Sequence, residues 1–356
     1  MRSLGPVSAV VCNYEGERYL ADCLESLLTQ EDPPDEVIVV DNGSTDGGVA
    51  LIRERFPWVR VVELGENTGA SGARNVGMRT AKHRWVLAVD NDTVLRPDVL
   101  SKLRAALEAD ADAVAAQTRN VFADEESRVH YDGGRFHYAG LYSLRNFQRP
   151  LAEAEGAGVL VADGLIAICL LLDRDTVLEV GGYDEDFFVL YEDLDLSLRL
   201  RLAGHRLLSV EDAIVLHKGG TAGISFRSGS YPRERVRLHS RNRWLLLLKN
   251  YHWRTLVLCF PGILVYELAW LLFTLLRGHS FAYLTGKVDF LRCARRALER
   301  RREVQARRTM RDRDLLVGGP LTLTPRLTHS GAAGLAARVL CAVLAGWWRV
   351  VRPFCA

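Results

Sequence analysis

The sequence feature that most constrains the fold is a series of four short β-branched runs, each ending in polar or glycine residues. They cover residues 7–12, 36–40, 59–64 and 85–89. Short, mostly apolar runs of this kind are typical of parallel strands that are buried on both faces. Between them, segments such as 19–28 and 72–80 place apolar residues at helical spacing. The alternation predicts an α/β fold built on an open, doubly wound and mostly parallel sheet.

Polar side chains follow three of the predicted strands. In open α/β sheets, ligands bind outside the carboxyl ends of the strands. Here those ends carry Asn13, Asp41 and the triplet Asp90-Asn91-Asp92. Two carboxylates one residue apart offer the oxygen ligands that Mg²⁺ or Mn²⁺ prefers, and these ions commonly bridge to phosphates. The triplet therefore indicates a metal–diphosphate site, although Asp-x-Asp after a strand is also common as a solvated turn or helix cap.

Two glycine-containing loops are further candidates for ligand binding. In residues 41–47, small turn residues let the backbone approach a ligand, and Asp41 can accept hydrogen bonds from a base or ribose. The alternative for this loop is a plain Asx turn. Residues 67–75 enter a predicted helix whose first amides, with Arg74, can hold an anion. This loop matches neither the dinucleotide-binding nor the P-loop pattern, which disfavours both kinds of site.

Acidic residues crowd the start of a later predicted helix. Glu192, Asp193 and Asp195 fall within four residues, and mutual repulsion raises a carboxylate pKa toward that of a useful base. The ordinary interpretation, acidic capping of a helix, needs only one or two of them. His217 follows the apolar run 213–216, and a lone histidine in such a place is more often structural.

Taken in order, these motifs resemble those of the family 2 glycosyltransferases. The series is Val-Cys-Asn-Tyr-Glu at 11–15, Val-Asp-Asn-Gly-Ser-Thr-Asp-Gly at 40–47, Asn-Thr-Gly at 67–69, Asp-Asn-Asp at 90–92, Gly-Gly-Tyr-Asp-Glu-Asp-Phe-Phe at 181–188, Glu-Asp-Leu-Asp at 192–195 and a late His217. The resemblance covers about residues 7–250 and is greatest to the rhamnosyltransferase-like branch. It implies an inverting enzyme with a GT-A nucleotide-binding fold.

The resemblance also implies roles for individual residues. Asp193 is the expected general base, with Glu192 the second choice, and Asp92 with His217 is expected to bind Mg²⁺ or Mn²⁺. Asp41 is expected to contact the nucleotide base, and Asp90 the ribose or sugar. The full expected nucleotide-sugar-binding set is Asn13, Glu15, Asp41, Asn67, Gly69, Arg74, Asp90 and Asn91.

The C-terminal part has a different character. Residues 255–276 carry Glu267 as their only charge and form a predicted helix of about 33 Å, long enough to span a bilayer. Residues 277–313 follow with a net charge of +8, which leaves −6 for the remainder of a chain whose total is +2. A single span from the cytosol would place these cations on the far side, against the positive-inside tendency. We therefore expect a re-entrant or in-plane helix, bent at Pro261-Gly262.

A second apolar stretch, 335–351, places Arg338, Arg349 and Arg352 on one narrow face of a predicted helix. This pattern indicates a helix that lies in the headgroup region, and a buried helical cap is the alternative. We predict a catalytic domain at 1–240, a membrane-associating segment at 241–313, and a linker with an amphipathic helix at 314–356. The expected location is the cytoplasmic face of the cell membrane, against an anionic surface. Nucleic acid is not expected as a partner, because aromatic residues hardly interleave the basic run.

The resemblance implies a metal-dependent transferase, and its closeness to the rhamnosyltransferase-like branch makes dTDP-rhamnose the expected donor. The expected enzyme is non-processive, and its expected acceptor is a hydroxyl of a lipid-linked or membrane-presented glycan. Processive synthases of the family carry Gln-x-x-Arg-Trp, whereas this chain has Ser240 at the glutamine position. The alternatives are a transferase with a UDP-sugar donor and a membrane-associated, non-catalytic scaffold on a transferase fold. A sugar nucleotidyltransferase is disfavoured because residues 13–16 lack its glycine-rich signature.

Overall fold

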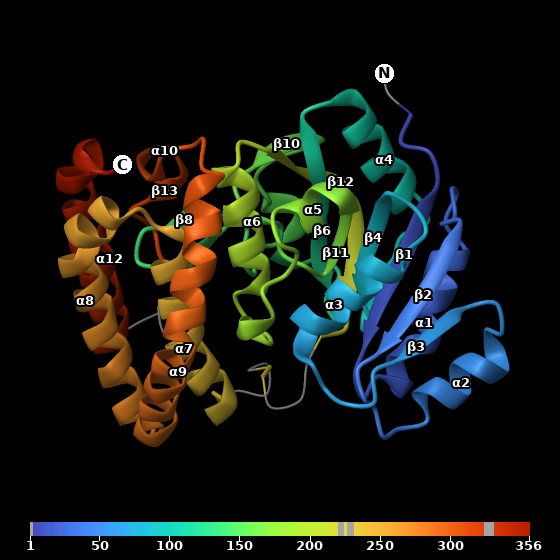
Figure 1. Cartoon of the computed structure of the whole chain (residues 1–356), viewed down its shortest axis with the longest axis horizontal. Coiled ribbons are helices and arrows are strands. Elements are labelled where there is room, and N and C mark those ends of the chain that lie inside the picture. The colour runs from blue at the N-terminus through green and yellow to red at the C-terminus, as the bar shows by residue number, and fades with distance from the viewer. Residues whose placement is uncertain (1–2, 220–223, 226–230, 324–330) are drawn as a thin grey trace. The chain divides into compact units, whose positions relative to one another are not determined.

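A computed structural model describes residues 3–219, 224–225, 231–323 and 331–356 (Figure 1). The chain forms two compact units. Unit 1 comprises residues 1–133, 145–200 and 205–220, and unit 2 comprises 134–144, 201–204 and 221–356. The short excursion 134–144 belongs to unit 2 although the chain around it belongs to unit 1. The domain boundaries expected at residues 240 and 313 stay predictions.

Unit 1 is built around a mixed β-sheet. Its strands are β1 Val7–Asn13, β2 Glu36–Asp41, β3 Arg60–Glu63, β4 Trp85–Asp90, β5 Thr93–Leu95, β6 Ala113–Phe122, β7 Val129–Tyr131, β10 Val159–Ala162, β11 Cys169–Asp173 and β12 Arg206–His217. The order is β10-β12-β6-β11-β4-β1-β2-β3, with β5 on β12 and β7 on β6. The four strands predicted from the sequence are β1 to β4, and they pair in parallel. The predicted α/β fold is confirmed.

The sheet departs from the expected mostly parallel arrangement in its second half. β11 pairs antiparallel with both β4 and β6, and β10 pairs antiparallel with β12. Parallel neighbours need a crossover connection, usually a helix, and the chain between β6 and β11 has no α-helix in the part that the structure describes. The antiparallel half therefore follows from how the chain is connected, which the strand sequences alone do not reveal.

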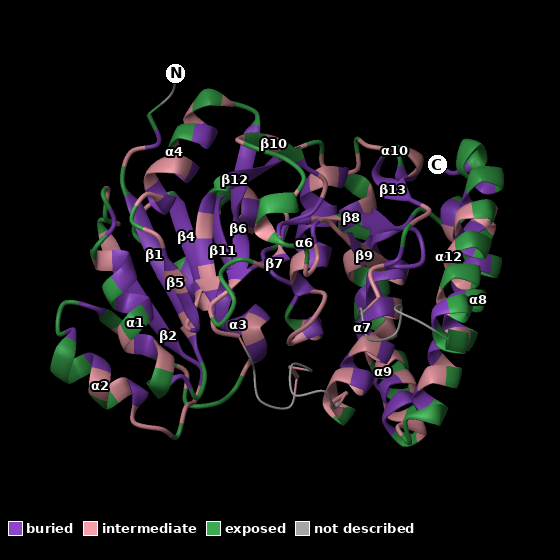
Figure 2. Ribbon diagram, turned by 180° about the vertical axis from the view of Figure 1, so that it is seen from behind, coloured by how far each residue is buried: buried purple, intermediate pink, exposed green. Residues whose placement is uncertain are grey.

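Six α-helices accompany this sheet: α1 Glu17–Leu28, α2 Gly48–Arg55, α3 Gly69–Thr80, α4 Val99–Ala109, α5 Arg174–Glu179 and α6 Glu192–Leu202. Short 3₁₀ turns cover Leu151–Glu153 and Glu185–Phe187. The helical spacing noted in residues 19–28 is that of α1, whose buried face includes Leu20, Cys23, Leu24 and Leu27. α3 packs on β1 and β2, and α4 packs on β6 and β12. Helix packing thus buries strands that are apolar almost throughout, and Figure 2 shows the central strands as buried.

Unit 2 is a helical unit with a small sheet. Its helices are α7 Arg233–Asn250, α8 Trp253–Leu276, α9 Ser280–Ala306, α10 Asp312–Leu315 and α12 Gly331–Val351, followed by a 3₁₀ turn at Arg352–Phe354. The sheet has the order β13-β8-β9, from Leu316–Val317, Gly134–His137 and Leu141–Leu144. α7 packs along α9, and α12 packs beside α8 (Figure 1). The two apolar helices expected from the sequence are α8 and α12, and α8 runs as one helix through Pro261.

Glu267, the single charge in 255–276, points into unit 2. Its carboxylate is paired with Arg243 of α7 and accepts hydrogen bonds from Trp244 Nε1 at 2.9 Å and Tyr283 Oη at 2.6 Å. Lys287 of α9 pairs with Oε1 of Glu267, whereas Arg243 pairs with Oε2. A buried charge persists only when it is paired and hydrogen-bonded in this way. The charge in α8 therefore joins three helices, and the outward face of α8 is left apolar.

We predict that Gly77→Ala destabilises unit 1. A Cβ at position 77 of α3 would lie 2.2 Å from Cγ1 of Val10 on β1, so the helix would have to move off the sheet. Overpacking of this kind costs about 1–3 kcal/mol. The free energy of unfolding, measured by urea denaturation, should fall in Gly77→Ala. Val10→Ala in that background should restore part of the loss, and strictly additive effects of the two substitutions would contradict the packing explanation.

Candidate active site

The strand pairing of the sheet brings residues that are predicted to bind ligands to the carboxyl ends of neighbouring strands, which we call the metal-binding edge. Asn13 at the end of β1 pairs with Asp41 at the end of β2, and Cys12 pairs with Asp90 at the end of β4. The short strand β5 returns antiparallel along β12, so that His217 lies opposite Thr93, the neighbour of Asp92. Asp90 and His217, 127 positions apart in sequence, thus lie close together because the strands that carry them end at the same place.

Three side chains at this edge offer a divalent cation its ligands. One donor atom each from Asp90, Asp92 and His217 lies within 4.8 Å of the others, and His217 Nε2 is 3.4 Å from Asp92 Oδ1. Two carboxylate oxygens and an imidazole nitrogen form a donor set that suits Mn²⁺ or Mg²⁺. The predicted ligands Asp92 and His217 therefore fit a divalent cation, and Asp90, which was expected at the ribose or sugar, lies with them as a third donor. Burial raises the pKa of Asp90, and the Arg74 charge partly counteracts this.

Arg74 of α3 connects this cluster to the start of α6. Its side chain is 7% exposed. Nη2 donates to Asp90 Oδ1 at 2.7 Å and to the Ala167 carbonyl at 2.8 Å, and Nη1 donates to Glu192 Oε1 at 2.8 Å. Both terminal nitrogens of Arg74 are thus engaged with protein oxygens. Its expected contact with the nucleotide sugar stays a prediction.

The adjacent carboxylates of α6 have different environments. Glu192 is buried and held by Arg74, and its Oε2 has no hydrogen-bond partner among the described residues. Asp193 is half-buried, accepting hydrogen bonds from the amides of Leu194 at 2.7 Å and Ala167 at 3.5 Å. Burial, with the neighbouring Glu192 charge, raises the pKa of Asp193 to about 7. Asp193 is therefore partly accessible, and none of its hydrogen bonds among the described residues comes from a cationic side chain. A pKa near neutrality is the property expected of a general base.

The loop after β2 is held by the polar residues expected to bind the nucleotide. Asp41 is 3% exposed and accepts hydrogen bonds from Asn13 Nδ2 at 2.8 Å and from the Ser44 amide at 3.0 Å. Asn13 Oδ1 in turn accepts from Asn91 Nδ2 at 2.7 Å. Glu15 Oε1 accepts from the Thr45 amide and hydroxyl. The structure thus joins Asn13, Asp41 and Asn91 in one chain of hydrogen bonds, and Glu15, on the loop after β1, binds the loop after β2 through Thr45.

The loop before α3 meets the segment that precedes α6. Asn67 Oδ1 accepts from the Gly69 amide at 2.9 Å. Gly69 has φ +75°, and a Cβ there would lie 2.4 Å from the carbonyl oxygen of Phe188, so both backbone conformation and space require glycine. Phe188, Leu190 and Tyr191 also have positive φ, a strained conformation for such residues. The strained turn ends directly before Glu192 and so helps to set where Asp193 lies.

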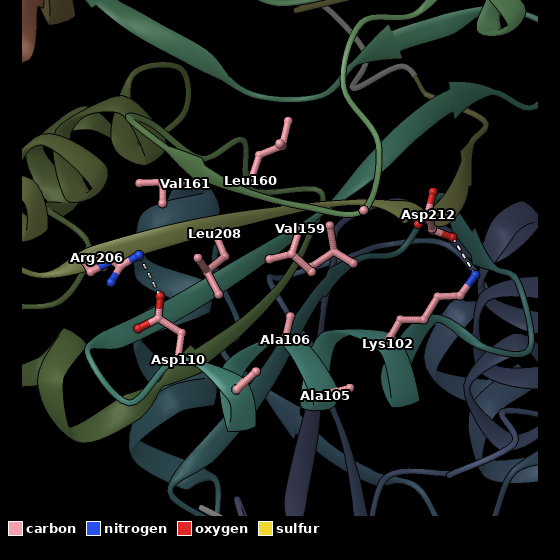
Figure 3. Close-up of a pocket in the computed structure, with 13 residues that line it drawn as sticks. Lys102, Ala105, Ala106, Asp110, Val159, Leu160, Val161, Arg206, Leu208 and Asp212 are labelled. Carbon is pink, nitrogen blue, oxygen red and sulfur yellow. Dashed lines mark hydrogen bonds and ion pairs between the residues drawn. The ribbon is translucent and has the colours of Figure 1, made fainter. Parts of the chain in front are cut away.

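A separate pocket of about 430 Å³ lies at the β10 edge of unit 1, between that strand, β12 and α4 (Figure 3). Its lining is mostly apolar, with Val159 and Val161 more than half exposed. The polar pairs there are Arg206 with Asp110 at 3.0 Å and Lys102 Nζ with the Asp212 carbonyl at 2.7 Å (Figure 3). None of the predicted site residues lines it, so it is not the candidate active site.

Two residues of the site carry no signal in the sequence. Ala167 contributes only its backbone, which donates to Asp193 and accepts from Arg74. His130 on β7 lies beside His217, with 2.9 Å between their Nδ1 atoms. Neither residue belongs to a motif, and neither lies close in sequence to the residue it contacts. Sequence reasoning therefore missed both.

Comparisons with known proteins point to a glycosyltransferase domain. Residues 8–162 match the sequence model of glycosyl transferase family 2. The succinoglycan biosynthesis protein ExoO of Rhizobium meliloti (strain 1021) is 38% identical over 128 residues, 36% of this chain and 35% of that protein. The N-acetylglucosaminyl-diphospho-decaprenol L-rhamnosyltransferase of Mycobacterium tuberculosis (strain ATCC 25618 / H37Rv) is 27% identical over 280 residues, 71% of this chain and 88% of that enzyme.

Among solved structures, GalNAc-T7 with UDP, GalNAc and Mn²⁺ matches with a TM-score of 0.56 at 15% identity. The match covers 72% of this chain and 51% of GalNAc-T7, so this chain spans about half the length of that protein and about a third of ExoO. At that identity the likeness shows the fold alone, a GT-A glycosyltransferase fold. The chain therefore carries a glycosyl transferase family 2 domain over residues 8–162, and its relatives include a glycosyltransferase matched over most of its length.

Proposed function

We propose that this protein is an inverting, metal-dependent glycosyltransferase that uses Asp193 as its general base. One observation carries the proposal. Asp90, Asp92 and His217 converge, and Arg74 links Asp90 to Glu192, directly before Asp193. A donor set for a cation that holds a diphosphate is thus connected through Arg74 to the residue beside a base with a pKa of about 7.

The reaction is a single displacement at the anomeric carbon of the donor sugar. Asp193 accepts the proton of an acceptor hydroxyl, and the oxygen forms the new glycosidic bond as the bond to the nucleoside diphosphate breaks. Attack from the face opposite the leaving group inverts the anomeric configuration. Asp90, Asp92 and His217 would hold the cation, which when bound supplies positive charge to the departing diphosphate. Glu192 Oε2, buried and unpartnered among the described residues, is positioned to accept a hydrogen bond from substrate.

The donor that we propose is dTDP-rhamnose, and the acceptor is a lipid-linked or membrane-presented glycan. The support is the similarity to the mycobacterial L-rhamnosyltransferase, whose name states a decaprenol-linked acceptor. Ser240 in place of the glutamine of processive synthases supports transfer of one or a few sugars. A UDP-sugar donor is the second candidate, and GalNAc-T7, which was crystallised with UDP, has the same fold.

We further propose that unit 2 binds the cytoplasmic face of an anionic membrane. α8 and the stretch 331–354 are long and apolar enough to cross a bilayer by length and composition. However, one face of α8 packs into the unit, with Cys259, Ile263 and Glu267 buried. The opposite face exposes an apolar stripe spaced three or four residues apart, comprising Val257, Phe260, Leu264, Leu268, Leu272 and Leu275. A helix with one packed and one exposed apolar face supports an in-plane arrangement.

The charges of unit 2 support the same orientation. α12 exposes Leu335, Val339, Val343 and Val350 together with its arginines, and α9 carries most of the basic run. Juxtamembrane cations contribute about 1 kcal/mol each at an anionic surface. The apolar stripes would enter the acyl boundary while the arginines meet the headgroups.

Asp193→Asn tests the proposed base. Loss of a general base costs about 10²- to 10⁴-fold in turnover but leaves substrate binding in place. Purified full-length protein with Mn²⁺ or Mg²⁺ should release nucleoside diphosphate from one nucleotide sugar of a panel, and EDTA should abolish the release. Asp193→Asn should lose turnover and keep the donor-induced melting shift, while the exposed Glu185→Gln keeps both. If no nucleotide sugar shifts the melting temperature of the wild type, the scaffold alternative is favoured.

The pH profile gives a second test. Asp193 acts only when deprotonated, so kcat should rise with pH through about 7 and level off above it. Glu192 is the second cause of the raised pKa. Glu192→Gln should therefore move the midpoint of the surviving activity to lower pH. A kcat that does not change from about pH 5 to pH 8 would exclude Asp193 as the base.

Vesicle sedimentation tests the membrane surface. Replacing a buried Leu side chain by a charge removes about 1.5–3 kcal/mol of burial, which is tenfold or more in affinity. Leu264→Glu and Leu268→Glu should each weaken binding to vesicles that contain anionic lipid by at least about tenfold. Val161→Glu introduces the same charge at an exposed valine of unit 1 and should bind like the wild type. Equal binding of all three variants would contradict the proposed surface.

A further inference from the structure

His130 lies beside the metal-binding edge without belonging to any motif. It is on β7, which pairs antiparallel with β6, and β6 pairs in parallel with β12, where Phe122 lies opposite His217. β6 thus separates the two strands that carry the histidines. The rings nevertheless meet, with centroids 5.0 Å apart and planes 23° apart, and each residue is 9% exposed.

The contact joins a particular pair of nitrogens. His130 Nδ1 and His217 Nδ1 are 2.9 Å apart, whereas the other nitrogen of His217, Nε2, is the one near Asp92. A histidine binds a cation through a nitrogen that carries no proton. If Nε2 of His217 is that nitrogen, the proton of the neutral ring lies on Nδ1, which donates to His130. His130 must then accept at Nδ1 and carry its own proton on Nε2.

We propose that His130 is a positioning residue, which fixes the ring orientation and tautomer of His217 so that Nε2 faces the cation. The proposal rests on the metal site of the proposed function. His130 acts through His217, because the converging donor atoms come from Asp90, Asp92 and His217. Partners that hold the second nitrogen of a ligating histidine are typically worth 10- to 100-fold in metal affinity.

The surroundings of His130 hold its own ring in place. The Tyr131 ring stacks on it at 3.8 Å between centroids, and the Phe122 ring lies at 4.3 Å with a tilt of 32°. An aromatic layer of this kind restricts rotation of the imidazole. His130 Nδ1 therefore faces His217 before any cation binds, and the His130 ring loses little rotational freedom when the cation binds.

The test measures Mn²⁺ binding to the full-length protein from the electron paramagnetic resonance signal of free Mn²⁺, with no nucleotide sugar. His130→Leu removes the acceptor and should raise the Kd for Mn²⁺ by about 10- to 100-fold. His130→Asn places an amide oxygen near the position of Nδ1 and should recover most of the affinity. Phe122→Leu removes the tilted ring but keeps the stacked Tyr131 ring and the hydrogen bond, and it should bind Mn²⁺ nearly as the wild type does.

The outcomes separate this inference from the proposed function. Wild-type affinity in His130→Leu, with binding lost in His217→Ala, would overturn the positioning role and leave the metal site standing. Equal loss in His130→Asn, His130→Leu and Phe122→Leu would show that packing, not the hydrogen bond, matters. If neither the wild type nor His217→Ala binds Mn²⁺, the metal site and the inference both fail. The melting temperature of each variant in EDTA shows whether it is folded.

Discussion

Arg74 joins the two parts of the candidate active site. Asp90 comes from the end of β4 and Glu192 from the start of α6, and the Arg74 guanidinium pairs with both while it also binds the Ala167 carbonyl. Removing one partner of a buried ion pair typically costs about 3–5 kcal/mol, because the remaining charge stays desolvated. The Arg74 pairs thus fix α6 to the strand ends, and with α6 the position of Asp193.

The pairing of Arg74 with Glu192 gives the adjacent acids Glu192 and Asp193 different environments. Glu192 is buried and paired with Arg74, whereas Asp193 is half-buried and accepts hydrogen bonds from backbone amides. A carboxylate that is partly desolvated and lies beside another negative charge retains its proton to higher pH, hence a pKa of about 7 for Asp193. In unit 2 the buried charge has a structural place. Glu267 is paired with Arg243 between the helices, and apolar side chains of α8 face outward.

The sequence named the candidate side chains more readily than it predicted the sheet. The Asp-x-Asp triplet and His217 follow apolar runs and the Glu-Asp pair crowds a helix start, and the structure brings Asp90, Asp92 and His217 together. The sequence did not predict that β11 pairs antiparallel with β4 and β6, because an apolar run such as Cys169–Asp173 is compatible with either strand direction. Excursion 134–144 was likewise invisible, since its membership in unit 2 depends on pairing with β13, over 170 residues away.

The sequence by itself determined the α/β class, the four parallel strands, the apolar helices of unit 2 and the residue types of the site. Local patterns suffice for these, because the periodicity of apolar residues and the chemistry of side chains are properties of short segments. Only the tertiary structure decided which groups meet. The contact of His130 with His217 and the bridge from Asp90 through Arg74 to Glu192 join segments far apart in the chain. Such contacts depend on strand order and register, which no single segment encodes.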